Sequence, residues 1–163
     1  MVLLSGPVCL APPESVAVRH FETVDQLYDE VRAALESADC LVMAAAVGDY
    51  APKERIAGKH KKGATMTLEL VPTRDVLKSV AEDKGRRVFV GFAVEAADAV
   101  ANARRKVEEK SLDMLVLNSP ESFGADSARF TLLFPGGRAR DLGTLRKSEL
   151  ARLVLDEIEA LRR

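Results

Sequence analysis

The sequence contains no tryptophan, two histidines and two cysteines among its 163 residues. Cys9 and Cys40 have no metal-ligand spacing, so we expect a reduced intracellular protein without a cysteine-based metal site. Neither sign of charge dominates, because 24 lysine and arginine residues stand against 25 aspartate and glutamate residues. The resulting net charge of -1 argues against a general affinity for nucleic acid or for an anionic membrane.

Long hydrophobic runs are also absent. The longest apolar stretches are too short to span a membrane, and the N-terminus lacks the charged start and long apolar core of a signal peptide. We therefore expect a cytoplasmic protein with no membrane partner. Apolar residues are nevertheless abundant, at 47% of the chain, and the length suits one domain with its own core. We predict a single domain over residues 1–163.

Apolar runs of strand length alternate with helical patterns along the chain. Strands are expected at residues 1–4, 16–21, 41–46, 66–71, 87–93 and 112–117. Helices are expected from a capping box at Thr23 to about residue 37, from a cap at Thr73 to about residue 85, over residues 96–110, and from about Arg146. The runs at 41–46 and 87–93 should be buried on both faces. A closing hairpin is expected through residues 135–137. These elements predict a Rossmann-like α/β fold, with a mostly parallel sheet, helices on both faces and a C-terminal antiparallel hairpin.

The stretch from residue 41 to residue 62 changes from apolar to charged within a few positions. A buried strand is followed by Gly48, by the carboxylate of Asp49 and then by a loop that is rich in lysine. Ligands bind at the carboxyl ends of strands in open α/β sheets, and one acid with a basic loop suits a polyphosphate with its sugar and metal. The alternative is that Asp49 caps a turn and that the loop is merely solvated.

Five motifs occur in a fixed order over nearly the whole chain: LLSGPV, AAVGDY, KHKK, VGFAVEA and KSLDMLVLN. Together they resemble the phosphopantothenate-cysteine ligase family, also called phosphopantothenoylcysteine synthetase, which acts in bacterial coenzyme A synthesis. The resemblance implies a CTP-dependent ligation of cysteine to 4'-phosphopantothenate through an acyl-cytidylate, with Mg²⁺ as counter-ion. It further implies a homodimer, with the basic loop near the partner copy, and a fused or associated phosphopantothenoylcysteine decarboxylase.

The resemblance also implies roles for individual residues. Lys59, the first residue of KHKK, would reach the phosphates and is the leading catalytic candidate, while the backbone of Ala45 would line the acyl-cytidylate pocket. Asp49 would hold the ribose or the metal, and Phe92 would pack on the cytosine. The remaining CTP contacts implied are Arg74, Asp75, Val76, Leu77, Lys106 and Lys110.

Several of these residues also have a structural alternative. Phe92 follows a buried strand and could be core, and Lys106 and Lys110 lie where a helix end favours cations in any case. The role of Asn118 could be limited to stabilising a turn. His20 and His60 are expected to have no role. The metal ligands, if any come from the protein, are not indicated by the sequence.

Relatives in this family have an additional strand, a loop of the form Asn-x-x-Ser-Gly-x-x-Gly and a helix upstream of LLSGPV, together about 30 residues. The resemblance therefore implies an N-terminally truncated domain that lacks part of its pocket and exposes an apolar sheet edge. Gly48, Arg74 and residues 117–120 also depart from the usual motifs. The alternative function is a non-catalytic nucleotide-binding or dimerisation module. A nicotinamide-dependent oxidoreductase is disfavoured, because no G-x-G-x-x-G loop follows any expected strand.

Overall fold

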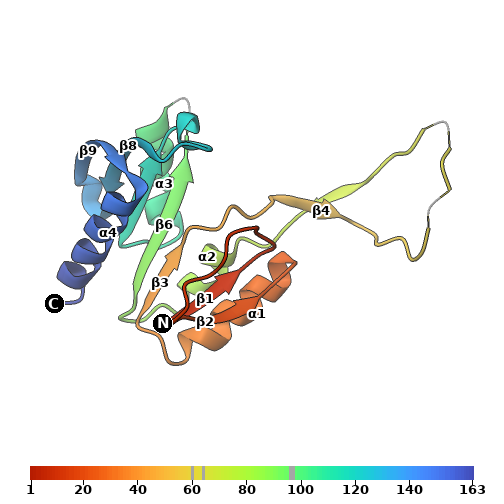
Figure 1. Ribbon diagram of the computed structural model, residues 1–163, viewed down its shortest axis with the longest axis horizontal. Coiled ribbons are helices and arrows are strands. Elements are labelled where there is room, and N and C mark those ends of the chain that lie inside the picture. Colours follow the sequence, from red (N-terminus) through yellow and green to blue (C-terminus); the bar gives the residue numbers. More distant parts are fainter. Residues whose placement is uncertain (60, 64, 96–97) are drawn as a thin grey trace.

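A computed structural model describes residues 1–163 except residues 60, 64 and 96–97. Strands and helices alternate along most of the chain (Figure 1). In order they are β1 (Val2–Ser5), β2 (Ala17–His20), α1 (Val24–Leu35), β3 (Cys40–Met43), β4 (Tyr50–Pro52), β5 (Leu70–Pro72), α2 (Val76–Ala81), β6 (Val88–Val94), α3 (Ala99–Glu109), β7 (Met114–Asn118), the 3-10 turn η1 (Pro120–Ser122), β8 (Ser127–Leu133), η2 (Pro135–Gly137), β9 (Ala139–Arg146) and α4 (Lys147–Leu161).

The largest sheet has the strand order β3-β6-β7-β8-β9. β3, β6 and β7 are parallel, whereas β8 and β9 pair antiparallel through the predicted turn at residues 135–137. Gly136 and Gly137 adopt positive φ angles of 71° and 83° there, a backbone conformation that favours glycine. The Rossmann-like α/β prediction, with its C-terminal hairpin, is confirmed.

Two apolar layers cover the two faces of this sheet. Phe89 of β6 packs with residues of α1, α2 and α3 on one face, which we call the α1 face. Its neighbours Val88 and Val90 point to the opposite face, the α4 face, where they pack with Leu150 and Val154 of α4. β6 and β7 are therefore buried on both sides, as the apolar sequence of residues 87–93 predicts.

The first helix begins as its sequence predicts. The Thr23 hydroxyl accepts a hydrogen bond from the Gln26 N–H at 3.2 Å, and the Gln26 side chain accepts one from the Thr23 N–H at 3.0 Å. The predicted cap of the second helix at Thr73 is wrong: Asp75 caps α2 by accepting from the Lys78 N–H at 3.1 Å. Thr73 lies two residues before this cap, and its hydroxyl donates instead to the Gly48 carbonyl at 2.6 Å.

Two other helix boundaries also differ from the prediction. α2 ends at Ala81, well before residue 85, and α3 begins at Ala99 rather than at residue 96. Residues 96 and 97 lie outside the described residues, so the first part of the expected α3 is not described there. Within the described residues, none of the helices is both long and apolar enough to cross a membrane.

The strand expected at residues 41–46 is only partly correct. β3 ends at Met43, and Val42 in its middle is 45% exposed, so this run is not buried on both faces. The physical reason is the position of the strand in the sheet. In the described part of the chain β3 pairs with β6 alone, and its other edge has no neighbouring strand.

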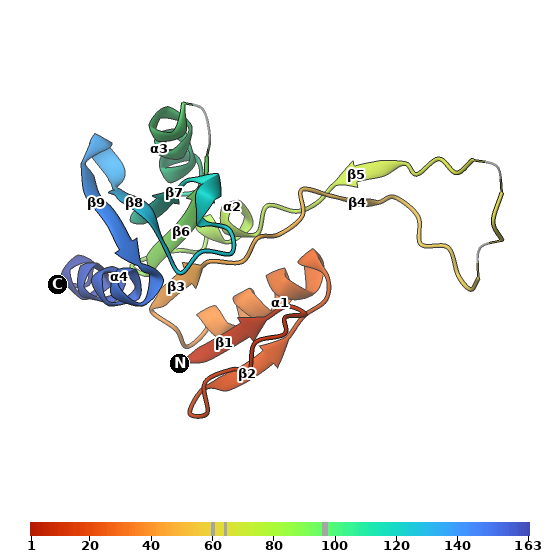
Figure 2. The same ribbon diagram turned by 45° about the horizontal axis from the view of Figure 1, so that its top comes forward.

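Residues 49–59, 61–63 and 65–73 belong to an extended arm that leaves the sheet (Figures 1 and 2). β4 and β5 pair antiparallel in its inner part, and Lys53 forms an ion pair with Glu69 at 2.7 Å. The strand expected at residues 66–71 is thus shorter and begins later, at Leu70, and Pro72 is its last residue. The chain exposes 11608 Å² in total. A compact monomer of this size exposes roughly 8,000 Å², so the arm and the sheet edges leave much surface uncovered.

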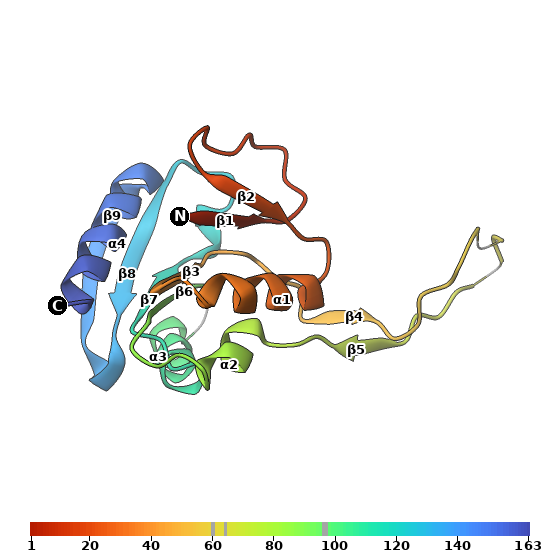
Figure 3. The same ribbon diagram turned by 90° about the horizontal axis from the view of Figure 1, so that it is seen from below.

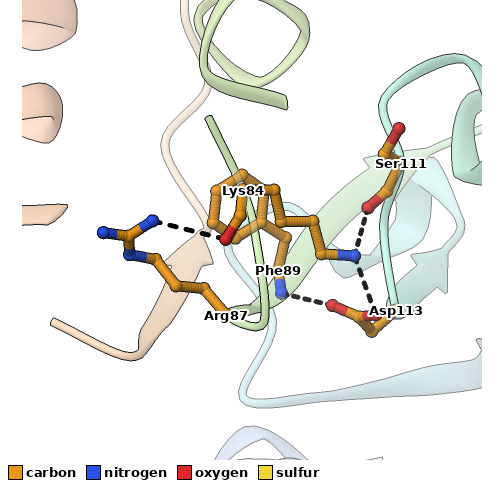
Figure 4. A network of polar contacts seen from close by, with 5 residues as sticks. All are labelled: Lys84, Arg87, Phe89, Ser111 and Asp113. Carbon is orange, nitrogen blue, oxygen red and sulfur yellow. Dashed lines mark hydrogen bonds and ion pairs between the residues drawn. The ribbon is translucent and has the colours of Figure 1, made fainter. Parts of the chain in front are cut away.

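A polar network fastens the start of β6 to the start of β7 (Figure 4). The Asp113 carboxylate accepts from the Phe89 N–H at 2.6 Å and from the Lys84 ammonium at 2.8 Å. Lys84 also donates to the Ser111 carbonyl at 2.7 Å. The network therefore ties the turn before β6 to the turn before β7 through one carboxylate.

Candidate functional site

The base of the arm joins the chain that leaves β3 to the chain that enters α2. The Thr73 N–H donates to the Asp49 carbonyl at 2.9 Å, next to the bond from the Thr73 hydroxyl to Gly48. The backbone of Asp49 is therefore held beside Thr73, which precedes the cap of α2 by two residues. The Asp49 side chain is exposed. The resemblance implies nucleotide contacts for both Asp49 and residues 74–77, and the structure brings the backbone of Asp49 to Thr73, next to the second of these segments.

Two lysines on α3 are each held by a carboxylate. Lys110 pairs with Asp75 at 2.9 Å, and Lys106 pairs with Glu95, the residue after β6, at 2.5 Å. Lys110 is the C-cap of α3 and follows Lys106 by one helical turn, so the two residues lie on the same side of α3. One of these cations is paired with the end of β6 and the other with the start of α2.

The hydrogen bonds of Asp75 determine its protonation. Burial raises the pKa of this carboxyl, but hydrogen bonds from Lys110 and from the Lys78 N–H outweigh burial and leave its pKa below the ordinary value of 3.8. Asp75 is therefore ionised at neutral pH, both as the counter-ion of Lys110 and as the cap of α2.

Replacing Asp75 with Asn should lower stability in a pH-dependent way. Asparagine is a good helix cap and can still accept the Lys78 N–H, so the change removes mainly the charge that faces Lys110. Because the folded pKa lies below the unfolded one, the contribution of Asp75 is complete above about pH 5 and is lost as pH falls through the lowered pKa. Urea unfolding of both proteins from pH 3 to pH 7 should show the two stabilities converging at the acid end. A difference that does not change with pH would contradict this account.

Other expected site residues lie elsewhere. Lys59 is exposed in the segment that joins β4 to β5, and this segment extends away from α3 (Figure 1). The Phe92 side chain packs on the α4 face, opposite the face of α2 and α3. Val76 and Leu77 are core residues, so their side chains are not available to a ligand. Ala45 is exposed just after β3.

Arg74 is directed toward α1. Its guanidinium lies 4.1 Å from the centroid of the Tyr28 ring, and its Nε lies 3.4 Å from a carboxylate oxygen of Asp25. Arg74 therefore connects α1 to the start of α2. The contact with a nucleotide that the resemblance implies would be an additional role.

Glu95 was not predicted as a site residue, although it belongs to the motif VGFAVEA. A carboxylate directly after a buried strand is the same signal that singles out Asp49, so the sequence contained a clue. The described residues contain no group of three or more histidine, cysteine, aspartate or glutamate side chains that could hold a metal ion. Two of the carboxylates in this part of the structure, Asp75 and Glu95, are already paired with lysines.

Comparison with known proteins places the chain in a family. The family model for the "DNA/pantothenate metabolism flavoprotein C-terminal domain" matches residues 1–161. The coenzyme A biosynthesis bifunctional protein CoaBC of Bacillus subtilis is 37% identical, and the match covers 99% of this chain and 41% of that protein. CoaBC of Mycobacterium tuberculosis (strain H37Rv) is 35% identical over 97% of this chain and 42% of its own length. The chain thus spans less than half the length of these curated relatives.

A solved structure supports the same conclusion. The crystal structure of the C-terminal domain of CoaBC superposes with a TM-score of 0.83 at 30% identity, covering 98% of this chain and 73% of that chain. The resemblance noted from the motifs is confirmed. This chain belongs to the family of the DNA/pantothenate metabolism flavoprotein C-terminal domain.

Proposed function

We propose that the chain is a phosphopantothenate-cysteine ligase domain of coenzyme A biosynthesis that uses CTP. The observation that carries this proposal is the pair of lysines on α3, Lys106 and Lys110, beside the end of β6 and the base of the arm. The match of nearly the whole chain to CoaBC proteins supports it. Two lysines one helical turn apart, each with a carboxylate counter-ion, suit a triphosphate, because the phosphates can replace the carboxylates as partners.

The chemistry that follows needs positioning and charge neutralisation. In the first step a carboxylate oxygen of 4'-phosphopantothenate attacks the α-phosphorus of CTP, and the bond to pyrophosphate breaks. In the second step the amine of cysteine attacks the acyl carbon, loses a proton, and CMP leaves. Lys106 and Lys110 would offset the charge that develops on the phosphates, and Asp49 would hold the ribose. Mg²⁺ would accompany the triphosphate, and no step is assigned to a metal held by the protein.

The arm provides the argument for a homodimer. It exposes apolar side chains that a monomer leaves in water: Tyr50, Ile56, Met66, Leu68 and Leu70. Large exposed apolar patches mark interaction sites. We propose that the arm packs on a second copy and brings Lys59 to the lysines of the partner copy. By analogy with the bifunctional relatives, the domain would work with a phosphopantothenoylcysteine decarboxylase, fused or associated.

Replacing Leu68 with Lys should weaken the dimer at least tenfold. Leu68 is 57% exposed on the arm, so a charge there costs little in the monomer but would be buried in the interface. Leu155→Lys on α4 is the matched control, because Leu155 is 60% exposed and lies away from the arm. Sedimentation equilibrium of the three proteins gives the dissociation constants. Equal dissociation constants for all three would show that the arm is not the interface.

The ligase itself is tested by pyrophosphate release with CTP and 4'-phosphopantothenate. Lys106→Met should raise the KM for CTP by roughly 10- to 100-fold, because it removes one charge-assisted contact to phosphate. Arg105→Met, an exposed cation one position away on α3, should leave KM unchanged. CTP binding without release of pyrophosphate that depends on phosphopantothenate would favour a non-catalytic nucleotide-binding module instead.

A further inference from the structure

A carboxylate and an ammonium group meet at the carboxyl end of the main sheet. Glu95 follows β6 directly, and its N–H donates to the Asn118 carbonyl at 3.1 Å, so its backbone continues the pairing of β6 with β7. Ala93 belongs to the apolar cluster on the α1 face, and Glu95, two residues further, points to the same face. There its carboxylate forms the ion pair with Lys106 of α3 at 2.5 Å.

This pair differs from the pair between Lys110 and Asp75, which joins the end of α3 to the start of α2 on the same face of the sheet (Figure 3). Asp75 has a second task, because it caps α2. In the part of the chain that the structure describes, Lys106 is the one polar partner of the Glu95 carboxylate. The Glu95 side chain is 16% exposed, so water replaces this partner poorly. Its carboxylate therefore depends on the Lys106 ammonium for charge balance.

Packing, rather than this ion pair, holds α3 on the sheet. Ala103 and Val107, on either side of Lys106 in the sequence, are 0% and 2% exposed and belong to the cluster on the α1 face. The pair with Glu95 thus determines where the Lys106 ammonium lies, and not where the helix lies. The Lys106 side chain is 36% exposed, so an incoming anion can reach its ammonium group.

We propose that Glu95 is an internal counter-ion that competes with anionic ligands for Lys106. In the free protein Glu95 neutralises the ammonium group, and a phosphate that binds Lys106 displaces it. Displacement leaves a shielded carboxylate without its partner and close to a second negative charge, which costs free energy. Glu95 therefore lowers the affinity of ligands that bring a phosphate to Lys106.

The inference rests on the proposed function for the identity of the ligand, which is the triphosphate of CTP. In that reaction Glu95 assists the release of pyrophosphate, because its carboxylate returns to Lys106 as the product leaves. Glu95 is thus a positioning residue: it acts on the nucleotide through Lys106 and has no contact of its own with the reacting atoms.

Isothermal titration calorimetry with pyrophosphate, and separately with CTP, tests the competition. Glutamine has the shape of glutamate and can still accept a hydrogen bond from Lys106, so Glu95→Gln removes mainly the charge. This variant should bind both ligands about 5- to 10-fold more tightly than the wild type. Glu109→Gln is the matched control, because it removes one negative charge from the exposed pair with Arg105 on the same helix. Its affinities should stay within about twofold of the wild type.

The gain in affinity should depend on Lys106. The double variant Glu95→Gln with Lys106→Met should bind no more tightly than Lys106→Met alone, because no cation is left there for Glu95 to neutralise. A gain that persists without Lys106, a gain equal to that of Glu109→Gln, or weaker binding by Glu95→Gln would overturn the proposal. Binding of neither ligand by any of the proteins would overturn it as well.

The same proteins separate this inference from the proposed ligase activity. Pyrophosphate release that depends on 4'-phosphopantothenate measures the ligase, and added pyrophosphate should inhibit Glu95→Gln about 5- to 10-fold more strongly than the wild type. If no pyrophosphate is released but Glu95→Gln gains affinity through Lys106, the ligase proposal fails and the internal counter-ion stands. If release occurs but Glu95→Gln and the wild type bind equally, the ligase stands and the internal counter-ion fails.

Discussion

A mixture of Lys59→Gln chains and Lys106→Met chains should regain about a quarter of the wild-type ligase activity at CTP concentrations below the wild-type KM, where each variant alone should be roughly 10- to 100-fold less active. Lys59 lies in the segment that joins β4 to β5, and this segment extends away from α3, the helix that carries Lys106 (Figure 1). If the arm serves the partner copy, each site combines Lys59 of one chain with Lys106 of the other. Half of the dimers formed by random mixing are mixed, and each mixed dimer contains one site with both lysines.

The same experiment distinguishes an arm that bends back onto its own chain. In that case each site of a mixed dimer would carry one defect, and mixing would restore nothing. The control adds Leu68→Lys to the Lys59→Gln chain, which should abolish the recovery by preventing mixed dimers. Pyrophosphate release gives the activity, and titration with CTP gives the fraction of intact sites. Recovery that survives the Leu68→Lys change would show that exchange through the arm is not its cause.

Local signals in the sequence predicted the parts of the fold that depend on local interactions. The capping box at Thr23 and Gln26 fixes the start of α1 because both of its hydrogen bonds join residues three apart. The uniformly apolar run of β6 predicts burial on both faces, which Phe89 and Val90 confirm. The spacing of Lys106 and Lys110 also places them on one helix face, and this requires only the period of a helix.

Features that depend on distant partners could not be predicted in this way. Nothing near Asp75 in the sequence indicates that it pairs with Lys110. Thr73 has the residue type of a helix cap, but the sequence does not show that its hydroxyl donates to the distant Gly48 carbonyl. The apolar neighbours of Val42 in the sequence predict that it is buried. Its actual exposure depends on which strands lie beside β3, and the sequence near Val42 does not contain that information.

Removing the carboxylate of Asp113 should lower the free energy of unfolding more than removing any other polar group discussed above. Its side chain is 27% exposed and that of Lys84 is 17% exposed, so the pair is largely shielded from water. Removing one partner of a buried pair costs about 3–5 kcal/mol, and partial exposure places this case at the lower end. In addition, the Phe89 N–H at the start of β6 would lose the Asp113 carboxylate as its hydrogen-bond acceptor. Asp113 therefore contributes through both a charge and a backbone hydrogen bond.

Asp113→Ala should lower the free energy of unfolding by about 2–3 kcal/mol, which corresponds to a melting temperature lower by roughly 4–12 °C. Asp113→Asn should cost less, because an amide oxygen can still accept the Phe89 N–H. Glu30→Ala is the matched control: it removes an exposed ion pair with Arg19 at 3.2 Å and should cost about 0.5 kcal/mol or less. Urea unfolding monitored by circular dichroism measures all three. A loss for Asp113→Ala no larger than that for Glu30→Ala would mean that the turns before β6 and β7 are held by packing alone.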